Sequence, residues 1–167
     1  MKIAFIGDLH FGARNSNQVI QRHQRSFLQN CFWPYIEKNN IKTVIQTGDY
    51  FDNRKWINLQ TMSFQKMYFV DFAEKLNVTV HGIIGNHDIP LRHSLAMNSP
   101  QQILTQSHMN FYDKPKTLNF DGVDITFIPW VCKENYEEVT NVIRKGGDIL
   151  VGHLETQGAV LLPGRLS

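Results

Sequence analysis

The segment that decides the fold runs Lys42-Thr-Val-Ile-Gln-Thr-Gly-Asp49, a short β-branched run that ends in glycine and then presents an aspartate. Its composition predicts a buried strand over residues 42–46. The same arrangement, an apolar run closed by glycine, recurs at Lys2–Ile6, Val78–Ile84 and Asp148–Val151. Repeated strands of this kind, separated by helical patterns, predict an α/β fold.

The segments between these strands predict the rest of the architecture. Residues 19–39 and 61–76 carry apolar side chains at three-to-four spacing, which predicts two helices. Shorter extended runs follow at 110–112, 116–120 and 123–128, and Asp121-Gly122 between the last two is a hairpin signal. A further helix is expected over 134–144, closed by Gly146-Gly147. We see no repeat or linker, so residues 1–167 are interpreted as a single domain.

Composition narrows the class of protein. The chain has 167 residues, 42% of them hydrophobic and 19% charged, which is typical of a folded domain with a core. No apolar run approaches the roughly 20 residues of a membrane span, and the N-terminus leaves no room for a signal peptide. Cys31 and Cys132 form no CxxC pair, so we expect two buried reduced thiols and a cytoplasmic protein. The net charge of +2 is too small to argue for nucleic-acid binding.

Four strand ends carry the residues that suggest chemistry. In an open α/β sheet, ligands bind beyond the carboxyl ends of the strands, so these loops can converge. Carboxylate, imidazole and amide oxygen together suit divalent ions such as manganese, iron or zinc. The segments are Gly7-Asp8-Leu9-His10, Gly48-Asp49-Tyr50-Phe51-Asp52, Gly85-Asn86-His87-Asp88 and Gly152-His153.

Each segment also has a simpler interpretation. A lone Gly-Asp at a strand end is usually a turn, and Asn-His-Asp alone is compatible with a helix cap or an Asx turn. Four segments in this order, each behind an apolar strand, are hard to obtain by accident. The cations near the first two motifs, including Arg14, Arg54 and Lys55, are compatible with ordinary solvated surface and equally with a polyphosphate substrate.

The order GDxH, GDxxD, GNHD, GH resembles the calcineurin-like metallophosphoesterase superfamily over nearly the whole chain. Within it, the Phe51-Asp52 ending, the Asn86-His87-Asp88 form and Phe127-Ile128-Pro129-Trp130 resemble the SbcD-type DNA exonuclease subunits. The stretches 46–55, 112–115 and 128–132 are particularly similar to the recombination nuclease subunit of large tailed phages. The resemblance implies a β-sandwich flanked by helices, in four layers α-β-β-α.

The resemblance also implies a ligand set for two divalent ions, with Mn²⁺ preferred and Mg²⁺, Fe²⁺ or Zn²⁺ as alternatives. Asp8 and His10 would hold one ion, Asn86 and His153 the other, and Asp49 would bridge them. Ions roughly 4 Å apart clamp the attacking and leaving oxygens of a phosphoester and lower the pKa of water.

Other residues are assigned roles beside the ions. His87 matches a family histidine that is not a ligand and would act as general acid; its alternative is to support Asp49 or Asp88. Asp88 would orient His87, while Asp52 would either support the site or contact substrate. Arg14 and Arg54 would support the site or meet the substrate.

One family motif is missing from the sequence. The pattern continues with a Gly-His-x-His loop some 30 to 40 residues after the Gly-His, but only 14 residues follow His153 and none is histidine. We therefore expect a C-terminally truncated domain without the capping region, with weakened metal binding and impaired cleavage, because losing even an indirect ligand partner costs about 10–100-fold.

The expected function is a metal-dependent DNA nuclease, exonuclease or endonuclease, working in recombination or repair. The resemblance implies an SMC-like ATPase partner of the SbcC type, in the host cytoplasm if the gene belongs to a phage. It also implies a homodimer, for which residues 19–39 and 61–76 are candidate surfaces; their apolar positions are equally well explained by packing in the core. The alternatives are a phosphatase or phosphodiesterase on a small phosphoester, and a domain that only binds DNA or a partner. Protein phosphatases of the superfamily carry glutamate at the position of Asp88, and this difference argues against the phosphatase alternative.

Overall fold

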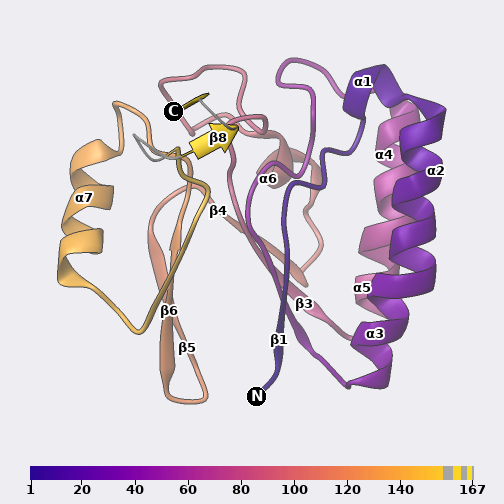
Figure 1. Cartoon of the computed structure of the whole chain (residues 1–167), viewed down its shortest axis with the longest axis horizontal. Coiled ribbons are helices and arrows are strands. Elements are labelled where there is room, and N and C mark those ends of the chain that lie inside the picture. The colour runs from indigo at the N-terminus through magenta and orange to yellow at the C-terminus, as the bar shows by residue number, and fades with distance from the viewer. Residues whose placement is uncertain (156–159, 163–164, 167) are drawn as a thin grey trace.

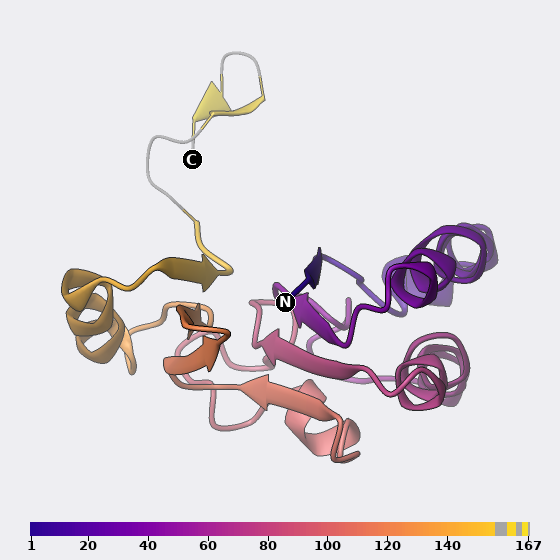
Figure 2. The same ribbon diagram turned by 90° about the horizontal axis from the view of Figure 1, so that it is seen from below.

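The computed structural model describes residues 1–155, 160–162 and 165–166. Two β-sheets lie face to face, with one layer of helices on each outer side (Figures 1 and 2). This confirms the α/β fold predicted from the sequence and the four-layer α-β-β-α arrangement that the resemblance implies.

The first sheet is wholly parallel, with its strands in the order β1-β2-β3-β4. Neighbouring residues of β2 face opposite sides: Val44 packs toward the helices, and Ile45 packs toward the second sheet. Because both faces are covered, the strand is apolar and β-branched without alternation, as is usual for parallel sheets. The strands are β1 (Ile3–Ile6), β2 (Thr43–Gln46), β3 (Thr79–Ile83) and β4 (Met109–Tyr112).

Two long helical segments cover the outer face of this sheet, at the right of Figure 1. Each was predicted as one regular helix, but each contains a π-helical turn at its middle. Leu28 and Trp33, five residues apart, are both buried, which is the spacing of a π-turn rather than of an α-helix. The first segment is α2 (Gln18–Phe27), η1 (Leu28–Phe32) and α3 (Trp33–Lys38). The second is α4 (Leu59–Gln65), η2 (Lys66–Val70) and α5 (Asp71–Lys75).

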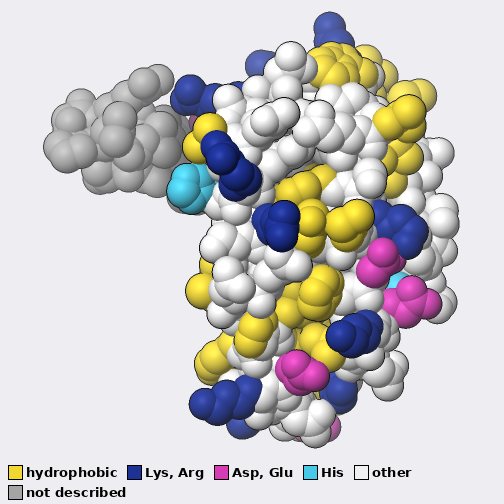
Figure 3. All heavy atoms as spheres, turned by 90° about the vertical axis from the view of Figure 1, so that its right-hand side faces the viewer, with side chains coloured by type: hydrophobic (Ala, Val, Ile, Leu, Met, Phe, Trp, Pro, Cys, Tyr) yellow, Lys and Arg dark blue, Asp and Glu magenta, His cyan; other side chains and the backbone are white. Residues whose placement is uncertain are grey.

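The two π-turns pack against each other through aromatic rings. The rings of Phe32 and Phe69 stack with centroids 6.3 Å apart, and Trp33 lies 5.2 Å from Phe69. Trp33 also donates its indole N–H to the carbonyl of Tyr68, at 2.8 Å. Buried aromatic side chains contribute about 1.5–3 kcal/mol each, so this contact holds the helix layer together. The outer surface of the layer keeps apolar patches among lysines and arginines (Figure 3), and Phe27, Tyr35 and Met67 are among its exposed residues.

The second sheet has the order β5-β6-β7. β5 (Lys116–Phe120) and β6 (Val123–Ile128) form the predicted hairpin, and Asp121 and Gly122 at its tip both have positive φ, as a type I′ turn requires. α7 (Tyr136–Lys145) then crosses the outer face and ends at Gly146, with φ of 72°. It returns the chain to β7 (Ile149–Gly152), which pairs parallel to β6.

The interface between the two sheets is a separate apolar cluster. It consists of Ile45, Ile83, Ile125, Phe127 and Val151, all 8% exposed or less. The cluster fixes the second sheet against the first and so places the end of β7 near the ends of β1, β2 and β3.

Four short elements were not predicted. The turn α1 contains residues with left-handed backbone, Arg14 and Asn15 among them, which no helical periodicity signals. They are α1 (Ala13–Ser16), α6 (Ser99–Ile103), β8 (Val160–Leu162) and β9 (Arg165–Leu166).

The cysteines differ in part from the prediction. Both are free thiols, as expected, and Cys132 is buried, but Cys31 is exposed on the outer side of η1. Of the helices in the described ranges, none has the length and hydropathy that a membrane span needs.

Candidate metal centre

The six predicted site residues meet at the carboxyl ends of four strands, at the upper edge of the sheets in Figure 1. β1 leads to Asp8 and His10, β2 to Asp49, β3 to Asn86 and His87, and β7 to His153. The donor atoms of Asp8, Asp49 and His153 lie within 4.8 Å of one another, as do those of His10, Asp52 and His87. Residues far apart in the sequence therefore form one polar centre.

The two oxygens of Asp49 face different partners. Oδ1 accepts a hydrogen bond from the backbone N–H of His87 at 2.8 Å. Oδ2 lies 3.6 Å from His10 Nε2 and 3.3 Å from His153 Nε2. Burial alone would raise the pKa of Asp49, but the hydrogen bonds from His153 and His87 outweigh it and hold this pKa below its usual value.

The tautomer of His153 makes this centre fit a cation. Nδ1 lies 3.0 Å from the carbonyl oxygen of Thr47, which can only accept, so Nδ1 carries the proton. In the neutral ring, Nε2 therefore presents a lone pair to Asp49 Oδ2 and, at 3.0 Å, to Asn86 Oδ1. Three acceptors that converge in this way repel one another unless a positive charge lies between them.

The spacing and chemistry of the donors agree with divalent ions. Ligands about 2.1 Å from an ion stand roughly 3–3.5 Å apart, and the contacts from Asn86, Asp49 and Asp8 to the imidazole nitrogens span 3.0–3.7 Å. Nitrogen and oxygen donors without thiolate suit manganese, iron, zinc or magnesium, so the residues fit the predicted ions. Without such an ion, a proton on Nε2 of His153 can supply the positive charge: burial alone would lower the pKa of His153, but the hydrogen bond to Asp49 and the negative charge of Asp49 outweigh it and raise this pKa.

His87 is oriented by a backbone carbonyl. Its Nδ1 lies 2.8 Å from the carbonyl oxygen of Asp52 and so carries a proton, which leaves Nε2 free to face a substrate. The ring stands edge-on to His10, with centroids 4.9 Å apart. The carboxylate of Asp52 lies 3.2 Å from His10 Nδ1, although no hydrogen bond forms at that angle and this nitrogen keeps no hydrogen-bond partner. Asp52 therefore orients His87 through its carbonyl, and its carboxylate faces His10 without a hydrogen bond.

The expectation that Asp88 orients His87 is wrong. The Asp88 carboxylate is fully buried and accepts the backbone N–H groups of Tyr50, Phe51 and Gly85 at 2.9–3.3 Å. It joins the loop after β2 to the loop after β3, and so sets the position of Asp49 relative to Asn86. Burial raises the pKa of Asp88 to about 7, although the N–H groups of Phe51 and Gly85 oppose the rise.

The ligand-bearing loops have an uncommon backbone. Asp8, His10 and Asp49 have φ of 50°, 43° and 53°, in the left-handed region that costs non-glycine residues roughly 1–2 kcal/mol each. The loops also approach closely: a Cβ on Gly85 would lie 2.3 Å from the backbone nitrogen and Oδ1 of Asp49. Gly85 is thus required because the two loops pack closely at this point.

Residues 1–161 match the family described as calcineurin-like phosphoesterase. The chain belongs to this family.

One curated relative and one solved structure illustrate the likeness. The chain is 36% identical over 169 residues to exonuclease subunit 1 of Enterobacteria phage T4, and it spans 49% of that protein's length. A protein of unknown function from Aquifex aeolicus matches at 19% identity with a TM-score of 0.45, over 92% of this chain and 79% of that one.

The predicted cations lie at different distances from the centre. Arg14 is exposed in the turn α1. Arg54 is half-buried and lines a cavity that also includes Asn86, together with Arg92 and Trp130. Trp130 was quoted above only for the resemblance, without a role at the site. The carbonyl groups of Thr47 and Asp52 were not predicted, because backbone acceptors leave no signal in residue types.

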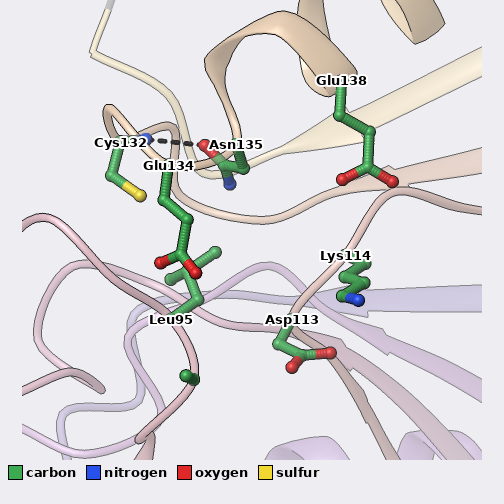
Figure 4. Close-up of a pocket in the computed structure, with 8 residues that line it drawn as sticks. Leu95, Asp113, Lys114, Cys132, Glu134, Asn135 and Glu138 are labelled. Carbon is green, nitrogen blue, oxygen red and sulfur yellow. Dashed lines mark hydrogen bonds between the residues drawn. The ribbon is translucent and has the colours of Figure 1, made fainter.

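A larger hollow lies outside this phosphoesterase centre (Figure 4). It measures about 500 Å³ and is bordered by Cys132 and by the carboxylates of Asp113, Glu134 and Glu138. Cys132 donates its backbone N–H to Asn135 at 2.8 Å, which shapes the rim. With three carboxylates and one lysine, Lys114, this hollow does not suit a phosphoester.

Proposed function

We propose that this chain is the nuclease domain of a DNA exonuclease or endonuclease. It would hydrolyse phosphodiester bonds with two divalent ions, for which Mn²⁺ is the preferred candidate. The observation that carries the proposal is the position of Asp49 Oδ2 between His10 Nε2 and His153 Nε2. The family assignment supports phosphoester hydrolysis, and the phage exonuclease relative supports DNA as substrate.

The residues divide the work between holding ions and moving protons. Following the family pattern, Asp8 and His10 would hold one ion, Asn86 and His153 the other, and Asp49 both. The contacts of His10 Nε2 with Asp8 at 3.7 Å and of His153 Nε2 with Asn86 at 3.0 Å support these pairs. Such a pair, when bound, supplies a nucleophile at neutral pH and stabilises charge on the attacking and leaving oxygens. Asp52 fixes the ring of His87 through its carbonyl, so that the doubly protonated ring can pass the proton on Nε2 to the departing sugar oxygen and return to the neutral form with its proton on Nδ1.

We further propose that the domain acts in a recombination or repair complex. The phage relative is a subunit of an exonuclease, which supports a protein partner for this chain; we suggest an SMC-like ATPase. The exposed apolar residues on the helix layer, such as Phe27 and Tyr35, are compatible with the proposed homodimer.

A leaving-group experiment tests the role of His87. Cleavage of labelled DNA and of bis-p-nitrophenyl phosphate is measured in Mn²⁺ for the wild-type chain and for His87→Asn. Since nitrophenolate departs without a proton and a sugar oxygen does not, His87→Asn should lower DNA cleavage by about 10²–10⁴-fold and nitrophenyl ester cleavage far less.

His23→Asn, an exposed histidine on α2, is the matched control and should cleave both substrates as the wild type does. Turnover of the small ester with no DNA cleavage by the wild type would contradict the nuclease proposal and favour a phosphodiesterase. Equal losses on both substrates in His87→Asn would contradict the acid role.

A further inference from the structure

A cavity of about 400 Å³ opens directly beside the candidate metal centre. It shares Asn86 with that centre, and the ring of Trp130 lies 6.2 Å from the ring of His153. The loops after β2, β3, β6 and β7 all contribute to its wall. The residues that matter here are Arg54, Asn86, Ile89, Arg92, Trp130 and Glu155.

Trp130 is fixed in this wall by its backbone. Its N–H donates to the carbonyl of Ile84 at 2.8 Å, and its own carbonyl accepts from the side chain of Asn135 at 3.0 Å. The first contact joins the loop after β6 to the end of β3, where the ligand loop begins. The half-buried indole is therefore held in a constant relation to Asn86 without being a ligand itself.

The lining has the chemistry of a nucleotide site. Arg54 and Arg92 supply two positive charges and Glu155 one negative charge, which leaves a net charge of +1 for the single negative charge of a phosphodiester. An indole offers a flat apolar face on which any base can stack. The volume is at the lower end for small-molecule sites, which suits one nucleotide better than two paired ones.

We propose that this cavity holds one unpaired nucleotide next to the scissile phosphate, with its base against Trp130 and its phosphate near Arg54 and Arg92. This subsite rests on the proposed nuclease function and specifies its substrate: the DNA must be single-stranded, or opened, at this position. Base pairing at this position therefore competes with binding of the nucleotide in the cavity.

Binding of a labelled thymidine oligonucleotide, followed by fluorescence anisotropy without divalent metal and again in Mn²⁺ in the His87→Asn background, tests the subsite. Trp130→Ala should weaken binding by about 5- to 100-fold, and Trp130→Phe should restore most of it. Arg54→Ala or Arg92→Ala should lower the slope of log K against log salt by about 0.7 each, whereas Trp130→Ala should leave that slope unchanged. Tyr136→Ala and Arg144→Ala, exposed side chains on α7, are the matched controls and should bind as the wild type does.

Oligonucleotides with one abasic position at each site in turn locate the contact. The wild type should bind one of them most weakly, and Trp130→Ala should bind all of them alike. A Trp130→Ala variant that folds, by its circular dichroism, and binds as tightly as the wild type would overturn the subsite. Absence of DNA cleavage by the wild type, with these binding differences intact, would instead contradict the nuclease function alone.

Discussion

Asp49 and Asp88 show how differently two neighbouring carboxylates are used. Asp49 keeps one oxygen, Oδ2, for the imidazoles of His10 and His153, and Asp88 spends both of its oxygens on backbone N–H groups. Asp49 is placed to hold ions, while Asp88 fixes the loop that carries Asp49. A glutamate at position 88 would have to place one more methylene in a fully buried space, which explains why the shorter acid fits here.

His81 gives a residue-scale prediction on pH. Burial lowers its pKa below 6.5, and its ring lies against Phe127, with Nδ1 2.7 Å from the Tyr112 hydroxyl. Below pH 6.5 the unfolded chain binds a proton that the folded chain resists, so the free energy of unfolding should fall as the pH drops toward the folded-state pKa. Between pH 7.5 and pH 5.5, the free energy of unfolding measured by urea denaturation should fall less in His81→Gln than in the wild type. An equal loss in the two proteins would contradict this account.

At the scale of elements, the sequence predicts regular structure well and its interruptions poorly. The hairpin of β5 and β6 has the predicted bounds, because alternation and Asp-Gly chemistry are local signals. The π-turns η1 and η2 were missed because a single wide turn shifts the helical phase without changing the residue types. The turn α1 was missed because its left-handed residues Arg14 and Asn15 are not glycines.

The start of α4 gives the element-scale prediction. Asn58 accepts the N–H of Thr61 at 2.8 Å and donates to the hydroxyl of Ser16, which in turn meets the hydroxyl of Thr61. Asn58→Ala should therefore lower the free energy of unfolding by about 1–2 kcal/mol, measured by urea denaturation. Asn58→Asp retains the cap acceptor and loses only the bond to Ser16, so it should lose less. A larger loss in the aspartate variant would show that the cap is not the cause.

The candidate site was predictable to the extent that side chains define it. Glycine-ended strands placed Asp8, His10, Asp49, Asn86 and His153 in four loops, and the topology of parallel strands brings such loops together. The carbonyl groups that orient His87 and His153 come from Asp52 and Thr47, and every residue type has such a group. Trp130 lies on a strand end that carries no ligand, so only the folded chain places it beside the site.

For the whole molecule, ions at this centre would join the two sheets. Ligands that bind only the folded chain stabilise it, by about 2.7 kcal/mol at 100 times Kd for one site. For a domain of this size that corresponds to a rise in Tm of about 5–10 °C. We expect excess Mn²⁺ to produce this rise in thermal denaturation and EDTA to reverse it.

Two variants identify where the ions act. Asp49→Asn should lose most of the Mn²⁺-dependent rise, measured from its own metal-free Tm, since it removes the carboxylate between His10 and His153. Asp113→Asn, which alters the acidic hollow, should keep the rise. If Mn²⁺ raises the Tm of Asp49→Asn as much as that of the wild type, the ions bind elsewhere.

The contact between His153 and the carbonyl of Thr47 spans 106 residues of sequence. During synthesis, Asp8, His10, Asp49 and Asn86 leave the ribosome well before the strand that delivers His153. A nascent chain that has formed only its first sheet would therefore have a metal centre that lacks His153. The centre would be completed only when β7 pairs with β6. The metal centre can therefore assemble only late in synthesis, because most of its ligands are translated long before His153.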